Sequence, residues 1–402
     1  MRFAALRIDA QSRRWKPLFD RMWPAYRAWY LKEGDNARPS LDACQAALEE
    51  HMPELVPQWR RLCELAGGDE LAARMLTLYR PPAYIFGCSQ AVWSRDEPFL
   101  IRNYDYSPDL AEGLILHTSW AGADGRTTRV VGMNDCLWGL VDGVNEHGVS
   151  LSLTYGGREA AGDGFGIPII LRYVLQIARD ADEAVAALRR VPSHMAYNVM
   201  VLDASGSHAL VELAPDREPR VTTERLSANH QTPARVAGGT PPPAGYAQRT
   251  RTHERAALIA RHLDDDAETP ERFVERFADE PLHSGDYEGA FGTLYTAVYR
   301  PKSRRAEYIW PGFVSRQSID AFHEGEAQII YNQGQLEVAE RRYDPQWPAE
   351  QRALEQSPET PVAADGHDAP WESHAGDWQR FLVDAPGDWQ RYLPEFMRPP
   401  ER

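Results

Sequence analysis

Apolar residues in the first 80 positions follow a helical period. They recur at spacings of three and four within 15–23, 48–55 and 71–78, which places them on one face of a helix in each case. The sequence Arg80-Pro81-Pro82 then disfavours further helix, because a residue before proline avoids the helical conformation. This pattern predicts that residues 1–80 are helical and that an extended segment follows them.

Beyond residue 88 the apolar period changes to two, which is typical of strands. Strands are predicted at 98–106, 137–144, 149–155, 198–203, 208–214, 221–228, 293–299 and 306–310. Helices are predicted at 167–190, with a break after which Asp180 or Asp182 restarts the helix, and at 252–263 and 270–277. This order of strands, helices and strands favours an α+β fold over alternating strand–helix units.

The composition changes after about residue 340. Residues 346–371 are rich in Pro, Ala, Glu and Asp, which is typical of a loosely ordered linker. A repeat follows, with Gly-Asp-Trp-Gln-Arg and two further residues at 376–382 and again at 387–393. Each copy places Trp, a second aromatic residue and Leu on one face of a short helix. We expect both copies to pack on the body, and binding of a partner is the alternative.

The net charge of −15 disfavours nucleic acid and anionic membranes as partners, because no basic stripe is available to neutralise phosphates. The four cysteines are scattered without a Cys-x-x-Cys spacing, so neither a zinc site nor a disulfide framework is expected. The N-terminus lacks the apolar stretch of a secretory signal, and no window of 18 apolar residues could span a membrane. We therefore expect a reduced, cytoplasmic protein without a metal or cofactor.

The pair Gly87-Cys88 stands where the helical pattern gives way to strands. If this bond breaks, Cys88 carries both a thiol and an α-amine. The thiol can then attack a carbonyl while the amine, whose ordinary pKa is about 8, takes the proton. A free cysteine is more often a small apolar core residue, so the interpretation depends on the motifs that follow.

Five motifs follow Gly87-Cys88 in order. They are Arg102-x-x-Asp105, Asn145-Glu146-x-Gly148, Asp203-Ala204-Ser205-Gly206 between paired strands, Ala228-Asn229-His230 and a late strand with Thr293 and Val298. Over roughly residues 50–310, this ordered set resembles the acyl-coenzyme A:isopenicillin N acyltransferase family. It is more distantly similar to penicillin V acylases and bile salt hydrolases, which are all N-terminal-nucleophile hydrolases.

The resemblance implies a four-layer αββα sandwich, in which two antiparallel sheets stack between helical layers. It implies a helical propeptide or small subunit at 1–87, a catalytic domain at 88–340 and a linker with the repeat at 341–402. The implied activity is that of an autoproteolytic cysteine amidohydrolase or acyltransferase, which acts on a linear amide or activated acyl donor through a thioester. The partners are then a small molecule, the chain's own N-terminal fragment after cleavage and, as an open possibility, a second copy of the chain.

The resemblance also assigns roles to residues. Gly87-Cys88 would be the cleavage site and Cys88 the nucleophile, with its freed α-amine as general base and acid. Arg102 would lie near the thiol and favour the thiolate. Asp105 would accept a hydrogen bond from the α-amine and orient it.

Three further positions complete the implied site. The backbone N–H of Tyr155 and the side-chain amide of Asn229 would form an oxyanion hole. Tyr155 differs from those relatives that carry Asn there, which affects substrate preference rather than the backbone donor. The family's later arginine matches Arg255, and Arg251 is also within range.

Several alternatives stay open. In an ideal strand Arg102 and Asp105 point to opposite faces, so a shared site requires a strand end or a bulge near Asp105. The motif at 145–148 also fits a plain turn. His230 or His147 could serve as base in a Cys-His hydrolase without self-cleavage, and a catalytically silent scaffold is a third hypothesis.

The substrate is expected to be small, with an apolar acyl arm. Strand segments near the predicted nucleophile are aromatic or apolar, and such residues dominate ligand pockets. The residues expected to line this pocket are Tyr104, Tyr106, Trp138, Leu140 and Tyr155.

Overall fold

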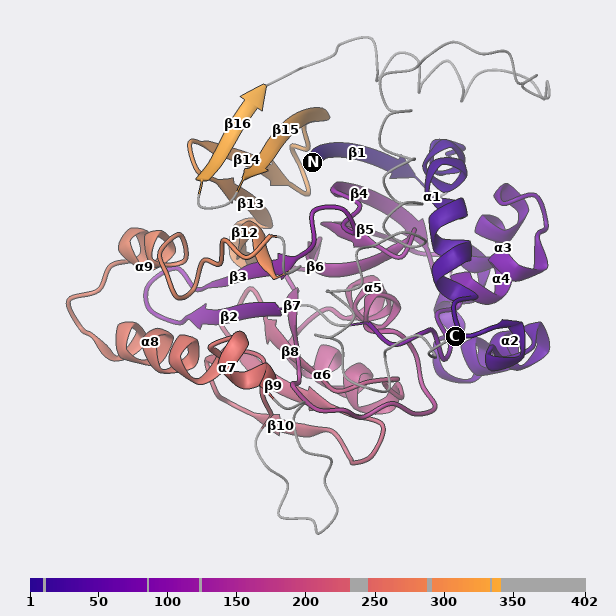
Figure 1. Cartoon of the computed structure of the whole chain (residues 1–402), viewed down its shortest axis with the longest axis horizontal. Coiled ribbons are helices and arrows are strands. Elements are labelled where there is room, and N and C mark those ends of the chain that lie inside the picture. The colour runs from indigo at the N-terminus through magenta and orange to yellow at the C-terminus, as the bar shows by residue number, and fades with distance from the viewer. Residues whose placement is uncertain are drawn as a thin grey trace.

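The computed structural model describes residues 1–9, 12–84, 87–122, 125–231, 245–287, 291–332 and 335–340. Two β-sheets are stacked, with helices on their outer faces and a further group of helices at one end (Figure 1). The predicted tail from residue 341 onward, with its linker and repeat, lies outside the described residues. The α+β fold with packed sheets is confirmed.

The larger sheet has ten strands. Every pairing in it is antiparallel except that of β1 with β4. In spatial order the strands are β10 (Arg220–Thr222), β9 (His208–Leu213), β8 (Tyr197–Leu202), β7 (Ser150–Tyr155), β6 (Gly139–Asn145), β5 (Thr127–Asp135), β4 (Leu114–Ala121), β1 (Arg2–Asp9), β15 (Gly325–Asn332) and β16 (Gln335–Glu340).

The strand β1 corrects the prediction that residues 1–80 are helical. It lies inside the larger sheet, parallel to β4 on one side and antiparallel to β15 on the other. Phe3, Ala4, Ala5, Leu6 and Ile8 are all buried, because both faces of the strand are covered. A short apolar run of this kind does not distinguish a strand from a helix by its period, and its partners are distant in sequence.

The smaller sheet has six strands and carries the predicted nucleophile. In spatial order these are β11 (Leu226–Ser227), β2 (Gly87–Trp93), β3 (Phe99–Tyr106), β12 (Gly292–Arg300), β13 (Arg305–Trp310) and β14 (Phe313–Ser318). All seven residues of β2 are buried. This strand is therefore covered on both faces, by the larger sheet and by helices.

Helices cover the outer face of each sheet. On the larger sheet, α5 (Ile167–Ile177) and α6 (Ala181–Arg190) lie against the strands, and α5 approaches β6 closely because Gly139 has no side chain. A Cβ at Gly139 would lie 2.5 Å from the Cβ of Pro168. On the smaller sheet, α8 (Thr252–Asp264) and α9 (Pro270–Arg276) pack on one apolar cluster that includes Trp93, Ile101, Ile259 and Phe273.

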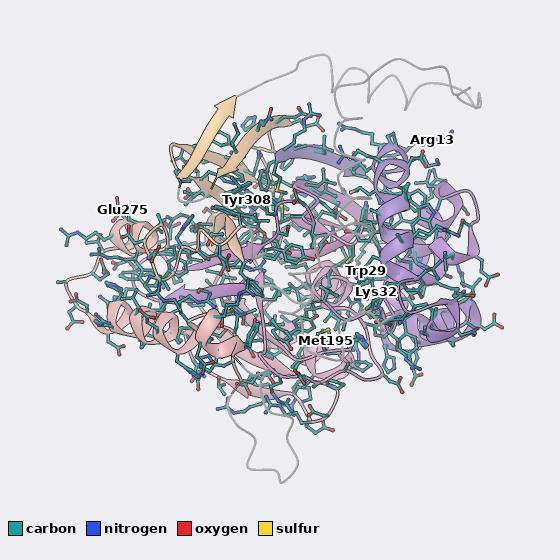
Figure 2. All side chains as sticks on the ribbon, viewed as in Figure 1. Arg13, Trp29, Lys32, Met195, Glu275 and Tyr308 are labelled. Carbon is teal, nitrogen blue, oxygen red and sulfur yellow. The ribbon has the colours of Figure 1, made fainter. Side chains whose placement is uncertain are left out.

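Side chains fill the space between the two sheets (Figure 2). We call the side of the smaller sheet that faces the larger sheet its inner face, and the side that faces α8 and α9 its outer face. Gln90 of β2 crosses the inner space, where its amide accepts a hydrogen bond from Ser152 at 2.5 Å and donates to the carbonyl of Asn198 at 3.1 Å. Such paired polar groups fix the register between the stacked sheets.

Four N-terminal helices pack at one end of the larger sheet (Figure 1), and they agree with the predicted helical pattern. They are α1 (Trp15–Tyr30), α2 (Leu41–His51), α3 (Val56–Leu65) and α4 (Glu70–Leu76). The indole of Trp15 donates to the carbonyl of Leu137 at 2.9 Å, and the indole of Trp138 donates to that of Leu76 at 2.8 Å. Residues 1–84 are therefore part of the packed body in the uncleaved chain.

Candidate active site

Cys88 lies in β2 at the point where the strand loses its neighbour on one side. The pairing of β11 with β2 ends at Ser227 opposite Gln90. Two side chains replace the missing strand: Asn229 Oδ1 accepts the amide N–H of Cys88 at 3.0 Å, and Arg255 donates to its carbonyl at 2.8 Å. Both backbone groups of Cys88 are thus held by side chains that the sequence analysis assigned to the site.

Arg102 reaches the thiol on the inner face. Its Nη2 donates to Cys88 Sγ at 3.1 Å, while its Nη1 donates to Asp142 Oδ2 at 2.6 Å and to the carbonyl of Val141 at 2.7 Å. Cys88 and Arg102 are fully buried. Burial raises the pKa of the Cys88 thiol to about 11 although Arg102 opposes this change, so the thiol is protonated near neutral pH in the uncleaved chain.

Asp105 approaches the same place from the outer face. Gly87 is paired with Asp105 across the ladder, and a Cβ on Gly87 would lie 3.0 Å from that of Asp105. The carboxylate accepts hydrogen bonds from Thr293 at 2.7 Å and from Arg255 at 3.2 Å. Burial raises the pKa of Asp105 above its ordinary value, while Arg255 and Thr293 act in the opposite direction.

A shared site of Arg102 and Asp105 therefore does not require the strand end or bulge in β3 that the sequence analysis called for. The register of β12 does shift between Thr293 and Tyr295, opposite this part of β3, yet the two side chains stay on the faces that strand alternation gives them. Arg102 contacts the thiol on one face, and Asp105 lies beside the preceding residue on the other. The bond between Gly87 and Cys88 passes between them.

The geometry also separates the two candidate arginines. Arg255 is 3% exposed, and besides its bonds to Cys88 and Asp105 it donates to Asn229 Oδ1 at 2.6 Å and to the carbonyl of Thr250 at 2.7 Å. Arg251 precedes α8 and pairs at the surface with Glu254 at 2.7 Å. One helical turn later, Arg255 faces the sheet.

Tyr155, at the end of β7, lies next to the amide of Asn229. The N–H of the following residue, Gly156, donates to the carbonyl of Ala196 on the side of β8. Since successive residues alternate their backbone direction in an antiparallel ladder, the N–H and carbonyl of Tyr155 point away from β8. Asn229 Nδ2 donates to this carbonyl at 3.3 Å, so both predicted oxyanion donors are adjacent.

The predicted histidines have other partners. Asn145 accepts the N–H groups of His147 and Val149 at 3.0 and 2.9 Å, which makes the motif at 145–148 a turn between β6 and β7. His230 Nδ1 lies 2.8 Å from Thr252 Oγ1, and its ring lies 4.5 Å from that of His253, centre to centre, in a tilted arrangement. Within the described ranges, neither His147 nor His230 has a hydrogen bond to Cys88.

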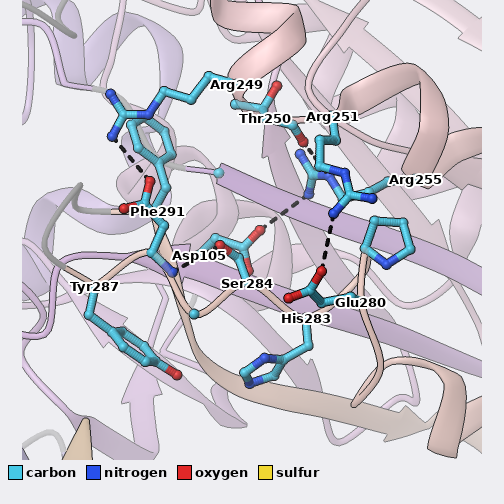
Figure 3. A pocket seen from close by; sticks show the side chains of 14 residues that line it. Asp105, Arg249, Thr250, Arg251, Arg255, Glu280, His283, Ser284, Tyr287 and Phe291 are labelled. Carbon is cyan, nitrogen blue, oxygen red and sulfur yellow. Dashed lines mark hydrogen bonds and ion pairs between the residues drawn. The ribbon is translucent and has the colours of Figure 1, made fainter. Parts of the chain in front are cut away.

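A cavity of about 480 Å³ opens on the outer face, next to Gly87 and Asp105 (Figure 3). Its lining is mostly charged or polar and comes from α7 (Tyr246–Arg249), the start of α8, residues 280–287, and Phe291. Two ion pairs span it, Arg249 with Asp286 at 3.2 Å and Arg251 with Glu280 at 3.4 Å. The five aromatic and apolar residues expected to form a pocket do not line this cavity.

Two of those five residues have clear places elsewhere. Tyr104 lies under the guanidinium of Arg102, 4.5 Å from its ring centre. Trp138 is fully buried against α4. Tyr104 therefore belongs to the space between the sheets and Trp138 to the contact with α4, rather than to the cavity on the outer face.

Three residues of this region were missed by sequence reasoning: Asp142, Tyr295 and Tyr299. The carboxylate of Asp142 accepts hydrogen bonds from both tyrosines and from Arg102. The signal that could have found Asp142 is its place as the lone charged residue in the otherwise apolar stretch 137–144, since a charge inside a buried strand needs partners.

Two further searches covered only the described ranges. No helix in them is long and apolar enough to cross a membrane. No group of three or more His, Cys, Asp or Glu side chains there could hold a metal ion.

Comparison with known families gives one match. The family model described as acyl-coenzyme A:6-aminopenicillanic acid acyl-transferase matches residues 93–314, which is more than half of the chain. The matched range contains Arg102, Asp105, Tyr155, Asn229 and Arg255, and it begins just beyond Cys88. A search of curated proteins finds no match.

Solved structures show distant similarity. Penicillin V acylase from Agrobacterium tumefaciens is 14% identical, with a TM-score of 0.40 over 63% of this chain and 98% of that chain. Two variants of conjugated bile acid hydrolase from Clostridium perfringens are 12% and 13% identical, with TM-scores of 0.37 and 0.36. They cover 64% and 61% of this chain and 97% and 98% of their own.

Proposed function

We propose that this chain, which belongs to the acyl-coenzyme A:6-aminopenicillanic acid acyl-transferase family, breaks its own Gly87–Cys88 bond and then transfers acyl groups through a thioester on Cys88. Membership makes the chain an enzyme of the hydrolase or acyltransferase class that acts on carbon–nitrogen bonds other than peptide bonds. One observation carries the finer proposal: the guanidinium of Arg102 lies 3.1 Å from the buried sulfur of Cys88, while the backbone N–H of Cys88 donates to Asn229 at 3.0 Å.

Maturation takes two steps. The thiol of Cys88 attacks the carbonyl carbon of Gly87, the bond from that carbon to the Cys88 nitrogen breaks, and the nitrogen leaves as an amine with the thiol's proton. Water then attacks the new thioester, which releases the thiol and a carboxylate on Gly87. The cavity that borders Gly87 supports this proposal, because it gives water a route to that carbonyl.

Turnover uses the groups that maturation frees. The α-amine of Cys88 takes the thiol's proton and later gives one to the leaving amine. Asn229 and Arg255, which hold the backbone of Cys88 in the uncleaved chain, keep the new terminus in place together with Asp105. The N–H of Tyr155 and the amide of Asn229 stabilise the oxyanion, for which their adjacency is the supporting observation.

We propose that the N-terminal fragment stays bound after cleavage as a small subunit. The supporting observation is β1, which supplies an internal strand of the larger sheet between β4 and β15. Loss of this strand would leave β4 and β15 each with an unpaired edge. It would also expose the buried side chains of Leu6 and Ile8 on the released fragment. The fragment is therefore a partner of the catalytic domain at 88–340.

The proposed substrate is a small amide or activated acyl donor. The cavity beside Gly87 has a volume within the usual range of about 300–1,000 Å³ for small-molecule sites. Its ion pairs favour a polar group on the outer face, while Tyr104 on the inner face is the kind of residue that suits an apolar arm. The four cysteines are unpaired, which supports the proposal of a reducing, cytoplasmic location.

Intact-mass measurement under denaturing conditions tests the proposal. The native sequence should yield fragments of 87 and 315 residues that co-elute before denaturation, and Cys88→Ala should give one chain without turnover. Cys63→Ala is the matched control, because Cys63 lies on α3, far from the site in sequence, and should leave cleavage unchanged. An uncleaved native chain that still turns over amides would refute self-cleavage.

A further inference from the structure

Arg102, on β3 of the smaller sheet, belongs to a series of hydrogen bonds that connects the two sheets. Its partner Asp142 lies on β6 of the larger sheet, and both side chains have no exposure to solvent. The bond between Nη1 and Oδ2 measures 2.6 Å, while Nη2 of the same guanidinium lies 3.1 Å from the Cys88 sulfur. The guanidinium of Arg102 therefore faces both the carboxylate of Asp142 and the thiol of Cys88.

Asp142 does not depend on Arg102 alone. The hydroxyl of Tyr295 donates to Oδ2 at 2.7 Å, and the hydroxyl of Tyr299 donates to Oδ1. Burial and the charge of Asp142 raise the pKa values of both tyrosines well above the ordinary range, so they remain donors. The hydroxyl of Tyr308 lies 3.0 Å from that of Tyr299 and is one contact further from the carboxylate.

These contacts set up a competition for the charge of Arg102. In a buried site, an anion that accepts several hydrogen bonds is already stabilised, so it gains less from a nearby cation. Each tyrosine hydroxyl on Asp142 thus weakens the hold of Asp142 on Arg102. The guanidinium is then more available to a thiolate on Cys88.

We propose that Asp142, together with Tyr295 and Tyr299, forms a positioning group that sets both the direction and the effective charge of Arg102 at the Cys88 sulfur. The hydrogen bond to the carbonyl of Val141 fixes the orientation of the guanidinium against β6. The hydrogen bonds from the two tyrosines stabilise the carboxylate of Asp142 and so reduce its attraction for Arg102. The inference deepens the proposed function, because it names what controls the reactivity of the nucleophile.

Other charged and titratable groups face this cluster and stay constant in the test. On β3, the ring of Tyr104 lies against the guanidinium, and Asp105 opposes the thiolate from the outer face. Asp135, at the end of β5, acts on Arg102 through charge at longer range. From α8, Arg255 balances Asp105.

The test measures how readily Cys88 ionises in four variants of the full chain. Because Cys88 is fully buried, the readout is the ultraviolet absorbance of its thiolate, recorded against pH as the difference between each variant and the same variant with Cys88→Ala, so no reagent has to reach the sulfur. At a fixed pH below the thiol pKa, Asp142→Asn should raise the thiolate fraction of Cys88 by about tenfold, which corresponds to a fall of about one pKa unit on removal of a nearby like charge. Tyr295→Phe and Tyr299→Phe should lower the thiolate fraction several-fold, because Asp142 then holds Arg102 more strongly.

Two controls separate this effect from general damage. The Cys88→Ala partner of each variant keeps the other three cysteines and the remaining tyrosines, so the difference cancels their absorbance. Tyr308→Phe removes a hydroxyl of the same cluster that does not touch Asp142, and it should leave the thiolate fraction within about twofold. A merely structural role would move all four variants in the same direction.

The outcomes are decisive whether or not the chain cleaves, because thiolate absorbance needs neither cleavage nor turnover. A thiolate fraction that stays constant or falls in folded Asp142→Asn overturns the inference. If Asp142→Asn does not fold, unchanged fractions in Tyr295→Phe and Tyr299→Phe overturn it as well. An uncleaved native chain with the expected fractions refutes self-cleavage and leaves the positioning role standing.

Discussion

Replacement of Arg255 by alanine should be the most destabilising single change on the outer face. The side chain is 3% exposed and donates to Thr250, Cys88, Ser89, Asp105 and Asn229. Without it, the buried carboxylate of Asp105 keeps only the hydroxyl of Thr293 as a donor at 2.7 Å among the described contacts. Removal of one partner from a buried ion pair typically costs about 3–5 kcal/mol, and we expect a loss of this size.

The loss should depend on pH. Burial already raises the pKa of Asp105 in the folded chain, and loss of Arg255 removes the main opposing charge, so the folded variant holds its proton to higher pH than the unfolded chain does. Such a group stabilises the fold at low pH, and this contribution disappears as pH rises through the folded pKa. The difference in free energy of unfolding between the variant and the native chain should therefore grow with pH, by at most about 1.4 kcal/mol per pH unit.

Urea unfolding at several pH values measures this effect. Asp105→Asn in the Arg255→Ala background should recover part of the stability, with a coupling of about 0.5–3 kcal/mol between the two sites. Arg251→Ala, an exposed residue one turn earlier in the same helix region, is the matched control and should cost less than about 1 kcal/mol. A loss that is equal at all pH values and is not rescued by Asp105→Asn would refute the reasoning.

Two further predictions concern catalysis and cleavage. Asn229→Ala should lower kcat by about 10²–10³ with little change in KM, because its amide acts mainly in the transition state; a change in KM alone, in steady-state kinetics on the matured enzyme, would instead make it a substrate-binding residue. Gly87→Val should slow self-cleavage at least tenfold, because even a Cβ there lies 3.0 Å from Asp105 and 3.2 Å from Phe291; a native cleavage rate by mass spectrometry would contradict this.

The sequence predicted well those elements whose pattern is local. The strands at β3, β6 and β7 and the helices α5, α8 and α9 lie within a few residues of their predicted positions. The three strands are short, almost entirely buried runs bounded by turn signals, and this local pattern is enough to locate them. The restart of helix near Asp180 is also confirmed, since this side chain caps α6 by accepting the N–H of Glu183.

Five strands of the larger sheet were not predicted: β1, β4, β5, β15 and β16. The partners of β1 are distant, since it pairs with β4 more than 100 residues later and with β15 more than 300 residues later. The period of a short apolar run carries no information about such partners. The pairs β4 with β5 and β15 with β16 are neighbours in the sequence, so distance does not explain why they were missed.

The site shows the same limit in finer detail. The ordered motifs identified the family, and they named residues that the fold brings to one place, from Cys88 to Arg255. The motifs could not predict in which direction each side chain points. Asp105 lies on the outer face, and Arg251 points to the surface while Arg255 points inward. Asp142 joins the cluster only because β6 of one sheet crosses β3 of the other.

The position of the N-terminus beside β15 has a consequence for circular permutation of the chain. The α-amine of Met1 donates to the carbonyl of Ile329 at 2.7 Å, so the start of the chain lies beside the strands that close the catalytic domain. A circularly permuted chain could therefore begin at Cys88 and carry residues 1–87 on a linker after β16. Once its initiator methionine is removed, such a chain would carry the α-amine of Cys88 without the self-cleavage proposed for the native order.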